Sequence, residues 1–414
     1  MLRIHDALTG RTGELAPGRA VRLHTCTPAS AEPSGHLGDL RPHVLADVIR
    51  RLLESRRVRV VACRGPLPGG DPAALGAFRR VAGALNLRPP EHEPLADEAA
   101  EAAVELIAGL VERGRAHLAP DGSVRLGAPA DDHPAPSGAA ASPSAAASPG
   151  AAASPGAAAS PGAAASPGAA APSGHAAPSG GPALAGGEGR SGSIAQGGMT
   201  GAQGAPPGGD VDPVLWAVSG GEPAWDSPWG RGAPTAGVRC QAAARRSLGA
   251  RVDILVAGGH APSHGDEPLL ETGHVVTGGP VRFDGPALSA EQVTEAGLDP
   301  LAVRLAYLEH HYREPVHLTW DLLRDADREV RRWRARVAGW AESPSAPLSS
   351  GYVERVEAAL DDDLDTPAAL RALRDLDGDD SVAAGAKFES FLRLDQVLAL
   401  DLSAEIGRAP APTL

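Results

Sequence analysis

Apolar positions in the N-terminal part of the chain alternate between strand-like and helix-like spacing. Residues 2–26 contain two short apolar stretches separated by a turn that contains glycine. Apolar side chains three and four positions apart predict a helix over 42–55, and the short apolar run at 58–63 predicts a buried strand. Helical spacing returns at about 72–85 and 94–114. A strand, a crossover helix and a second strand predict a parallel sheet.

The C-terminal half begins with strand-like patterns and then becomes helical. Residues 211–216 and 252–259 resemble strands on either side of a helix near Cys240. From 289 to 340, apolar residues recur at helical spacing with dense charge between them, and 351–402 adds two or three more helices. The fold class predicted is therefore α/β, a parallel sheet domain followed by a C-terminal helical bundle.

The segment between these halves has a different composition. Residues 129–210 are mostly Ala, Ser, Pro and Gly, and Ser-Pro-Gly recurs every six residues from Ser148 to Ser166. A hexapeptide β-helix needs a large apolar residue in each repeat, which this segment lacks. We predict a disordered linker over 129–210. It divides the sheet domain into 1–128 and 211–288, with the helical bundle at 289–407.

Charge and hydropathy restrict the partners. The chain of 414 residues has 38 basic and 51 acidic side chains, a net charge of −13, which argues against broad electrostatic binding of nucleic acid. Lys387 is its only lysine. Neither a signal peptide pattern near residues 1–30 nor an unbroken apolar run of membrane-spanning length is present. We expect a soluble cytoplasmic protein without a membrane partner, of unknown oligomeric state.

Two short features offer candidate chemistry. The three cysteines Cys26, Cys63 and Cys240 are odd in number and widely spaced, so free thiols or metal ligands are expected rather than a disulfide. His36-Leu37-Gly38-Asp39 lies in a loop between a predicted strand and a predicted helix, where backbone N–H groups can meet a phosphate. By itself, this tetrapeptide favours a turn that only caps the helix over a phosphate site.

A longer motif gives these residues a context. The stretch 211–240 resembles cysteinyl-tRNA synthetases, which are class I synthetases, and the related, shorter mycothiol-pathway cysteine ligases. The positions that match in register are Leu215, Trp216, Gly221, Glu222, Pro223, Trp225, Ser227, Pro228, Gly230 and Cys240. In that register Cys26 falls on the family's first zinc cysteine, HLGD on its HIGH motif and Asp47 on an acidic helix position. The segment 361–367, DDDLDTP, resembles a C-terminal signature of the family.

The resemblance implies a class I synthetase fold, Rossmann-like, with a zinc ion that binds the substrate thiol. Cys26 and Cys240 match two of its ligands, and the resemblance assigns the others to His264 and Glu267, because Ser263 stands where the family has its histidine. His260 and Asp266 are the alternatives. Two interpretations stay open, a zinc site or a vestigial site whose cysteines are ordinary buried residues.

The nucleotide site implied by the resemblance is incomplete. It places His36, Gly38 and Asp39, with the glycine turn Gly258-Gly259, around ATP and Mg²⁺. Asp39 replaces the second histidine of HIGH. Residues 278–289 replace the lysine loop KMSKS and contain one cation, Arg282, which with His36 is the candidate catalytic pair. Negative charge near the phosphates and missing lysines weaken the electrostatic stabilisation that adenylyl transfer needs.

Two functions are therefore expected. The first is an ATP-dependent cysteine ligase that forms cysteinyl-adenylate and transfers cysteine to an amino sugar or tRNA. The ending of the chain soon after 397–402 favours the amino sugar, because the tRNA ligases continue into an anticodon-recognising tail. The second is a catalytically inactive synthetase-fold paralogue that binds a small ligand or a protein.

Overall fold

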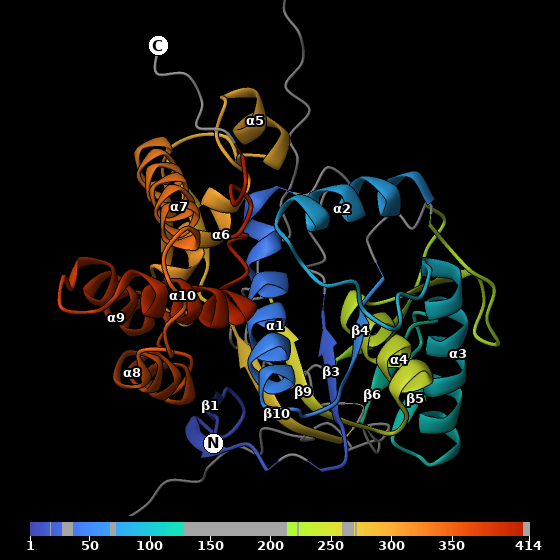
Figure 1. Ribbon diagram of the computed structural model, residues 1–414. Helices are drawn as coiled ribbons and strands as arrows, with labels where there is room; N and C mark the ends of the chain where they lie inside the picture. The colour runs from blue at the N-terminus through green and yellow to red at the C-terminus, as the bar shows by residue number, and fades with distance from the viewer. Residues whose placement is uncertain are drawn as a thin grey trace, which may run out of the picture. The chain divides into compact units, whose positions relative to one another are not determined.

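We describe the fold from a computed structural model of the chain (Figure 1). It describes residues 1–16, 18–26, 36–66, 72–127, 213–221, 223–258, 269 and 271–408. These residues belong to one compact unit. The predicted linker lies outside the described residues. Among the described residues, no helix has both the length and the apolar character needed to cross a lipid bilayer.

A four-stranded parallel sheet is at the centre of this unit. Its order is β10-β9-β3-β4, and every neighbouring pair is parallel. The strands are β3 (Val21–Thr25), β4 (Val60–Arg64), β9 (Arg251–Ala257) and β10 (Glu271–Thr277). The chain passes from β3 outward to β4 and returns later to β9 on the other side of β3. The strand order therefore reverses between β3 and β9, and crevices at such a point bind ligands in open α/β sheets.

Alternating side chains of the sheet meet different helices. The crossover helix α1 (Leu37–Ser55) joins β3 to β4, and α4 (Ala236–Leu248) precedes β9. Leu23 and Val60 belong to the main core together with α1, whereas Val61 and Cys63 pack with Ala244 and Leu248 of α4. The predicted parallel α/β sheet is confirmed.

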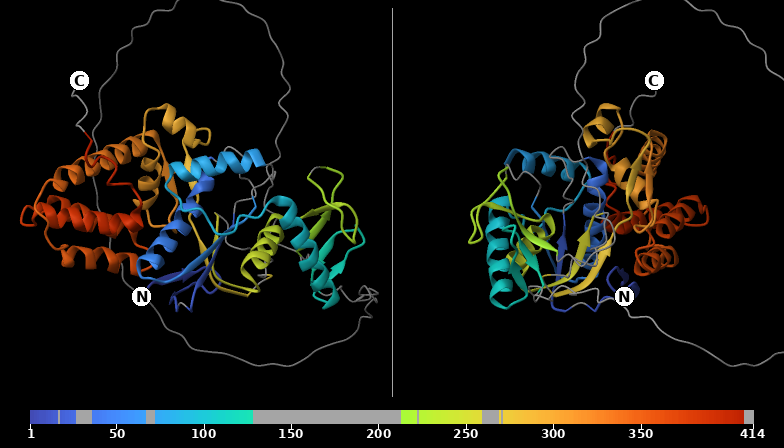
Figure 2. Two further views of the ribbon diagram at one scale, coloured as in Figure 1. Left: turned by 45° about the vertical axis from the view of Figure 1, so that its right-hand side comes forward. Right: turned by 180° about the vertical axis from the view of Figure 1, so that it is seen from behind.

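A second, antiparallel sheet holds the family motif at 211–240. Its order is β5-β6-β7-β8. These strands are β5 (Ala116–Leu118), β6 (Val124–Leu126), β7 (Val214–Val218) and β8 (Gly232–Pro234). Helix α3 (Ala96–Glu112) contributes Leu106 and Ile107 to its core, and Trp216 is fully buried there. The predicted strand at 211–216 therefore joins this separate sheet. Figure 2 shows it beside α3 and α4, away from the C-terminal helices.

The C-terminal part is helical, as predicted. Its helices are α5 (Ala290–Glu295), α6 (Leu301–Leu308), α7 (Trp320–Ala341), α8 (Ser350–Asp361), α9 (Thr366–Gly378) and α10 (Ala384–Leu398). Trp333 of α7 and Phe391 of α10 are fully buried and pack edge to face. The remaining elements are the hairpin β1 (Arg3–Asp6) and β2 (Arg11–Glu14), helix α2 (Pro72–Ala84), and the parallel pair β11 (Val281–Phe283) and β12 (Val316–Leu318).

A buried charge network fixes α1 to this helical part. Asp47 accepts hydrogen bonds from Arg51 Nε and from Arg304 of α6, each at 2.7 Å. Arg304 is fully buried and also donates to the backbone oxygen of Leu398, at 2.6 Å. Burial by itself raises the pKa of Asp47, but Arg304 and Arg51 outweigh it, so the pKa lies below its ordinary value. The carboxylate is therefore the counter-charge of two buried guanidinium groups.

Gly279, just before β11, is the position where we expect a small substitution to matter. A Cβ there would overlap the backbone oxygen of Glu314, whereas a Cβ at Gly339 in α7 meets open space. Gly279→Ala should therefore lower the free energy of unfolding by about 1–3 kcal/mol. Gly339→Ala, the control, should raise it by about 0.5–1 kcal/mol through helix propensity. Urea unfolding of both variants measures the difference. Equal values would show that the backbone near Gly279 relaxes freely.

Candidate active site

The candidate site lies where the parallel strands end. Cys26 follows the last residue of β3, and its N–H donates to the oxygen of Val256 in β9, at 2.8 Å. Gly258 comes directly after β9. The two segments predicted to hold the thiol and the nucleotide therefore leave the sheet side by side, at the point where the strand order reverses.

Cys26 and Cys240 are joined by a disulfide, with their Cα atoms 6.0 Å apart. The expectation of free thiols was wrong for these two residues. It rested on wide sequence spacing, whereas the fold brings the end of β3 against α4 across 214 positions. Cys63 is the free cysteine, and burial raises its pKa to about 11, so its thiol stays protonated and unreactive at neutral pH.

His24 is a site residue that the sequence analysis did not identify. It is fully buried in β3, with Nδ1 3.1 Å from the oxygen of Cys63 and Nε2 3.0 Å from Sγ of Cys240. Burial lowers its pKa to about 4, so the ring is neutral at pH 7. The available signal was strand periodicity, because Cys26 directly follows the strand and side chains two positions apart on an extended chain face the same side.

The donor set of this cluster suits zinc once the sulfurs are reduced. The ligand atoms of His24, Cys26 and Cys240 lie within 4.8 Å of one another. Two sulfurs and an imidazole nitrogen are ligands that zinc prefers. The sulfurs cannot hold a metal in this way while they are bonded to each other. His264 and Glu267, the other predicted ligands, lie outside the described residues, as do their alternatives His260 and Asp266.

His36 caps the N-terminus of α1, as its place before the helix predicted. Its Nδ1 accepts a hydrogen bond from the N–H of Gly38, at 3.0 Å. The ring hydrogen is therefore on Nε2, which lies 3.6 Å from Oδ2 of the buried Asp39. A Cβ at Gly38 would come within 2.6 Å of the His36 ring, so only glycine fits there without displacing it. The imidazole N–H is thus directed at a carboxylate.

The segment that replaces the lysine loop lies against His36. The N–H of Leu37 donates to the oxygen of Leu288 at 2.7 Å, and His36 forms a β-bridge with Ser289. Phe283 packs edge to face on the His36 ring, with centroids 6.0 Å apart. Its neighbour Arg282, the predicted cation, is exposed. The two segments therefore lie side by side in the structure, while the catalytic roles of His36 and Arg282 stay predictions.

Arg41, another cation near this segment, stabilises the fold. Arg41 of α1 donates to the backbone oxygens of Gly279 and Glu314, both at 2.6 Å, and of His311 at 3.0 Å. Its guanidinium thereby holds together the two strands that follow Gly279 and Glu314. Gly259, the second predicted nucleotide glycine, lies outside the described residues.

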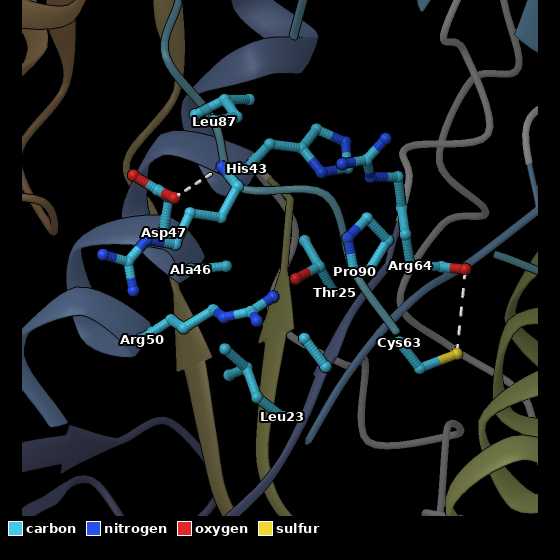
Figure 3. Close-up of a pocket in the computed structure, with 12 residues that line it drawn as sticks. Leu23, Thr25, His43, Ala46, Asp47, Arg50, Cys63, Arg64, Leu87 and Pro90 are labelled. Atoms are coloured by element: carbon cyan, nitrogen blue, oxygen red, sulfur yellow. Dashed lines mark hydrogen bonds between the residues drawn. The ribbon is translucent and has the colours of Figure 1, made fainter. Parts of the chain in front are cut away.

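A small cavity lies between α1 and the sheet (Figure 3). Its volume is about 30 Å³, and its lining includes Thr25, His43, Asp47 and Arg64. Burial, with Arg64 and His24 adding to it, holds the pKa of His43 well below its ordinary value. Pockets for small-molecule ligands have volumes of several hundred Å³, so this cavity does not hold a nucleotide.

Comparison with known proteins supports the family resemblance seen in the sequence. A family model described as tRNA synthetases class I (C) catalytic domain matches residues 200–272. The L-cysteine:1D-myo-inositol 2-amino-2-deoxy-alpha-D-glucopyranoside ligase of Streptomyces coelicolor is 30% identical over 411 residues, covering 90% of this chain and 88% of that protein. The chain belongs to the class I cysteinyl-tRNA synthetase family. The cysteine–tRNA ligase of Alkalilimnicola ehrlichii is 28% identical over 437 residues, covering 93% and 82%.

Solved structures agree with the family's fold. The apo form of Mycobacterium tuberculosis methionyl-tRNA synthetase covers 93% of this chain and 91% of its own, with a TM-score of 0.51 and 12% identity. At this identity the likeness concerns the fold alone. The predicted resemblance to the cysteinyl-tRNA synthetase family and the predicted class I α/β fold are both confirmed.

Proposed function

We propose that this chain is an ATP-dependent cysteine ligase, which activates L-cysteine as cysteinyl-adenylate and transfers it to an amine, as in an amino sugar. The observation that carries the proposal is the juxtaposition of Cys26 and Cys240 at the end of β3, beside the point where the strand order reverses. Relatives named as cysteine ligases, which match about nine-tenths of the chain, support the same substrate.

The reaction proceeds in two steps. The carboxylate of cysteine attacks the α-phosphorus of ATP, a P–O bond forms, and pyrophosphate leaves with the electrons of the broken bond. The acceptor amine then attacks the acyl carbon, AMP leaves, and the amine loses a proton to give the amide. We propose that the N-terminus of α1, with Gly38 and the His36 ring, binds the phosphates, and that Gly258 and Gly259 contact the nucleotide. Arg282 is the proposed cation on the departing pyrophosphate.

Recognition of cysteine is proposed to involve its sulfur. Zinc held by Cys26 and Cys240, when bound, would favour a substrate thiolate over the hydroxyl of serine. These residues orient the substrate side chain, so that its carboxylate reaches the phosphates at α1. Cytoplasmic location and the domain boundaries given above remain part of the proposal.

A second candidate function is a cysteine-binding protein that does not form the adenylate. Asp39 supports it, because its carboxylate is buried beside the His36 ring, where phosphate charge would develop. The segment 278–289, which has Arg282 as its only cation, supports it as well. Loss of several electrostatic contacts of a few kcal/mol each removes most of a rate enhancement.

Cysteine-dependent exchange of pyrophosphate into ATP, measured on the reduced full chain, distinguishes the two functions. The ligase predicts exchange with cysteine at least about 100-fold faster than with serine. It also predicts loss of exchange in the Cys26→Ser, Cys240→Ser double variant. Cys63→Ser, at the free buried cysteine, is the matched control and should keep the activity. Binding of radiolabelled cysteine without exchange would establish the second function and reject the first.

A further inference from the structure

His24 has its two ring nitrogens in different environments, and these fix its tautomer. Nδ1 is 3.1 Å from the backbone oxygen of Cys63, which can only accept a hydrogen bond. Nδ1 therefore carries the ring hydrogen. The other nitrogen, Nε2, directs its lone pair at Sγ of Cys240, 3.0 Å away. Metal-bound histidines commonly have this arrangement, in which one nitrogen donates to a carbonyl and the other holds the ion.

The disulfide gives this lone pair nothing to bind. A sulfur bonded to carbon and to another sulfur has no hydrogen to donate, so two lone pairs face each other in a buried site. Reduction by a dithiol removes the conflict. It supplies two electrons and two protons, the S–S bond breaks into the thiols of Cys26 and Cys240, and the dithiol becomes a disulfide. The Cys240 S–H then faces Nε2, or both sulfurs and Nε2 face one cation.

From these contacts we infer that His24 is a metal ligand in this chain: its Nε2 would hold zinc together with the sulfurs of reduced Cys26 and Cys240. The inference rests on the proposed function for the zinc ion itself. His24, from the strand itself, supplies the imidazole that the sequence lacks at Ser263. Binding of zinc there would release the protons of the Cys26 and Cys240 thiols.

Geometry, charge and access agree with this centre. Tetrahedral zinc with ordinary bond lengths separates its ligand atoms by roughly 3.5–4 Å, and these three atoms already lie within 4.8 Å of one another. Two thiolates balance the charge of Zn²⁺, which suits a site where His24 and Cys240 are buried. Cys26 is partly exposed, so the cluster is open to solvent on the side of that cysteine.

Metal binding by the full chain tests the inference without reference to activity. The protein is reduced under argon with a phosphine, and zinc content after dialysis and the visible spectrum with Co²⁺ are measured. We expect one metal per chain and a tetrahedral cobalt spectrum with thiolate charge-transfer bands. His24→Gln should weaken the affinity at least ~100-fold. The matched control is His43→Gln, at another buried histidine, which should keep both signals.

A second variant covers the case in which His24→Gln fails to fold. His24→Cys retains three ligands, so it should bind cobalt with stronger charge-transfer bands from a third sulfur, a change that a purely structural role would not produce. Reduced wild type without metal, or His24→Gln with unaltered affinity and spectrum, would overturn the inference. If the protein binds metal but does not exchange pyrophosphate, the metal centre is retained and the ligase function is rejected. If metal-free protein exchanges pyrophosphate, the ligase function is retained and the metal centre is rejected.

Discussion

Asp47→Asn is expected to lower the free energy of unfolding by about 3–5 kcal/mol, the largest stability effect that we predict for a single substitution. The asparagine keeps the shape of the side chain but removes the counter-charge of Arg51 and Arg304. Arg304 has no exposed surface, so its guanidinium would stay buried without the carboxylate to which it donates. Because this network joins α1 to α6, the loss should appear in urea unfolding followed by circular dichroism.

The stabilisation by Asp47 changes with pH in a direction that its lowered pKa determines. The pKa of Asp47 is lower in the folded chain than in the unfolded chain, so its stabilisation is fully present above the unfolded value of about 3.9. It is lost as the pH falls below that value, through the folded pKa. The difference between wild type and Asp47→Asn should therefore be constant from pH 7 to about pH 5 and shrink in more acidic solution.

The control for Asp47 is a carboxylate on the surface. Asp375 pairs with Arg355 at 2.6 Å, and both side chains are more than half exposed. Asp375→Asn should change the free energy of unfolding by no more than about 0.5–1 kcal/mol, because water screens such a pair. Adding Arg304→Met to Asp47→Asn should recover part of the loss. A loss below 1 kcal/mol for Asp47→Asn would mean that water reaches the network.

The sequence best predicted those elements whose burial requires a regular apolar pattern. Strands β4 and β9 carry apolar runs because side chains on both faces of the sheet are buried there, and the apolar residues of α1 recur at helical spacing, so their patterns identified them. The first four residues of strand β10, ETGHVVT, are polar or glycine and are exposed or half-buried, and the pattern missed this strand. The three-residue strands β5, β6 and β8 are too short for a period to be recognised.

The direction in which side chains point from a strand explains which site residues the sequence analysis did not predict. The resemblance placed Cys26 and Cys240 together, and the fold confirms that they meet. It could not indicate His24, whose role depends on facing α4 rather than α1. It also favoured Arg282 in β11, yet the residue that touches His36 is its neighbour Phe283, on the opposite face of the strand. One position along a strand decides whether a cation or an aromatic ring reaches the site.

Asp39→Asn is expected to strengthen ATP binding, the largest effect on ligand affinity that we predict for the nucleotide site. The Asp39 carboxylate lies in the first turn of α1, within 3.6 Å of the His36 ring, where the helix N-terminus would otherwise attract phosphate. A unit charge about 6–8 Å from a phosphate, at an effective dielectric constant of about 20, contributes roughly 2–3 kcal/mol of repulsion. Its removal should lower the Kd for ATP about 30- to 100-fold.

Isothermal titration with ATP measures this change, and Asp321→Asn is its control. Asp321 is an exposed carboxylate in the first turn of α7, so its replacement alters the net charge equally but leaves α1 intact. We expect an unchanged Kd for that variant. If Asp39→Asn also leaves the Kd unchanged, the phosphates do not lie at the N-terminus of α1. If it strengthens binding and raises pyrophosphate exchange together, the same carboxylate limits both steps, because charge that repels bound ATP also repels the charge that develops on the departing pyrophosphate.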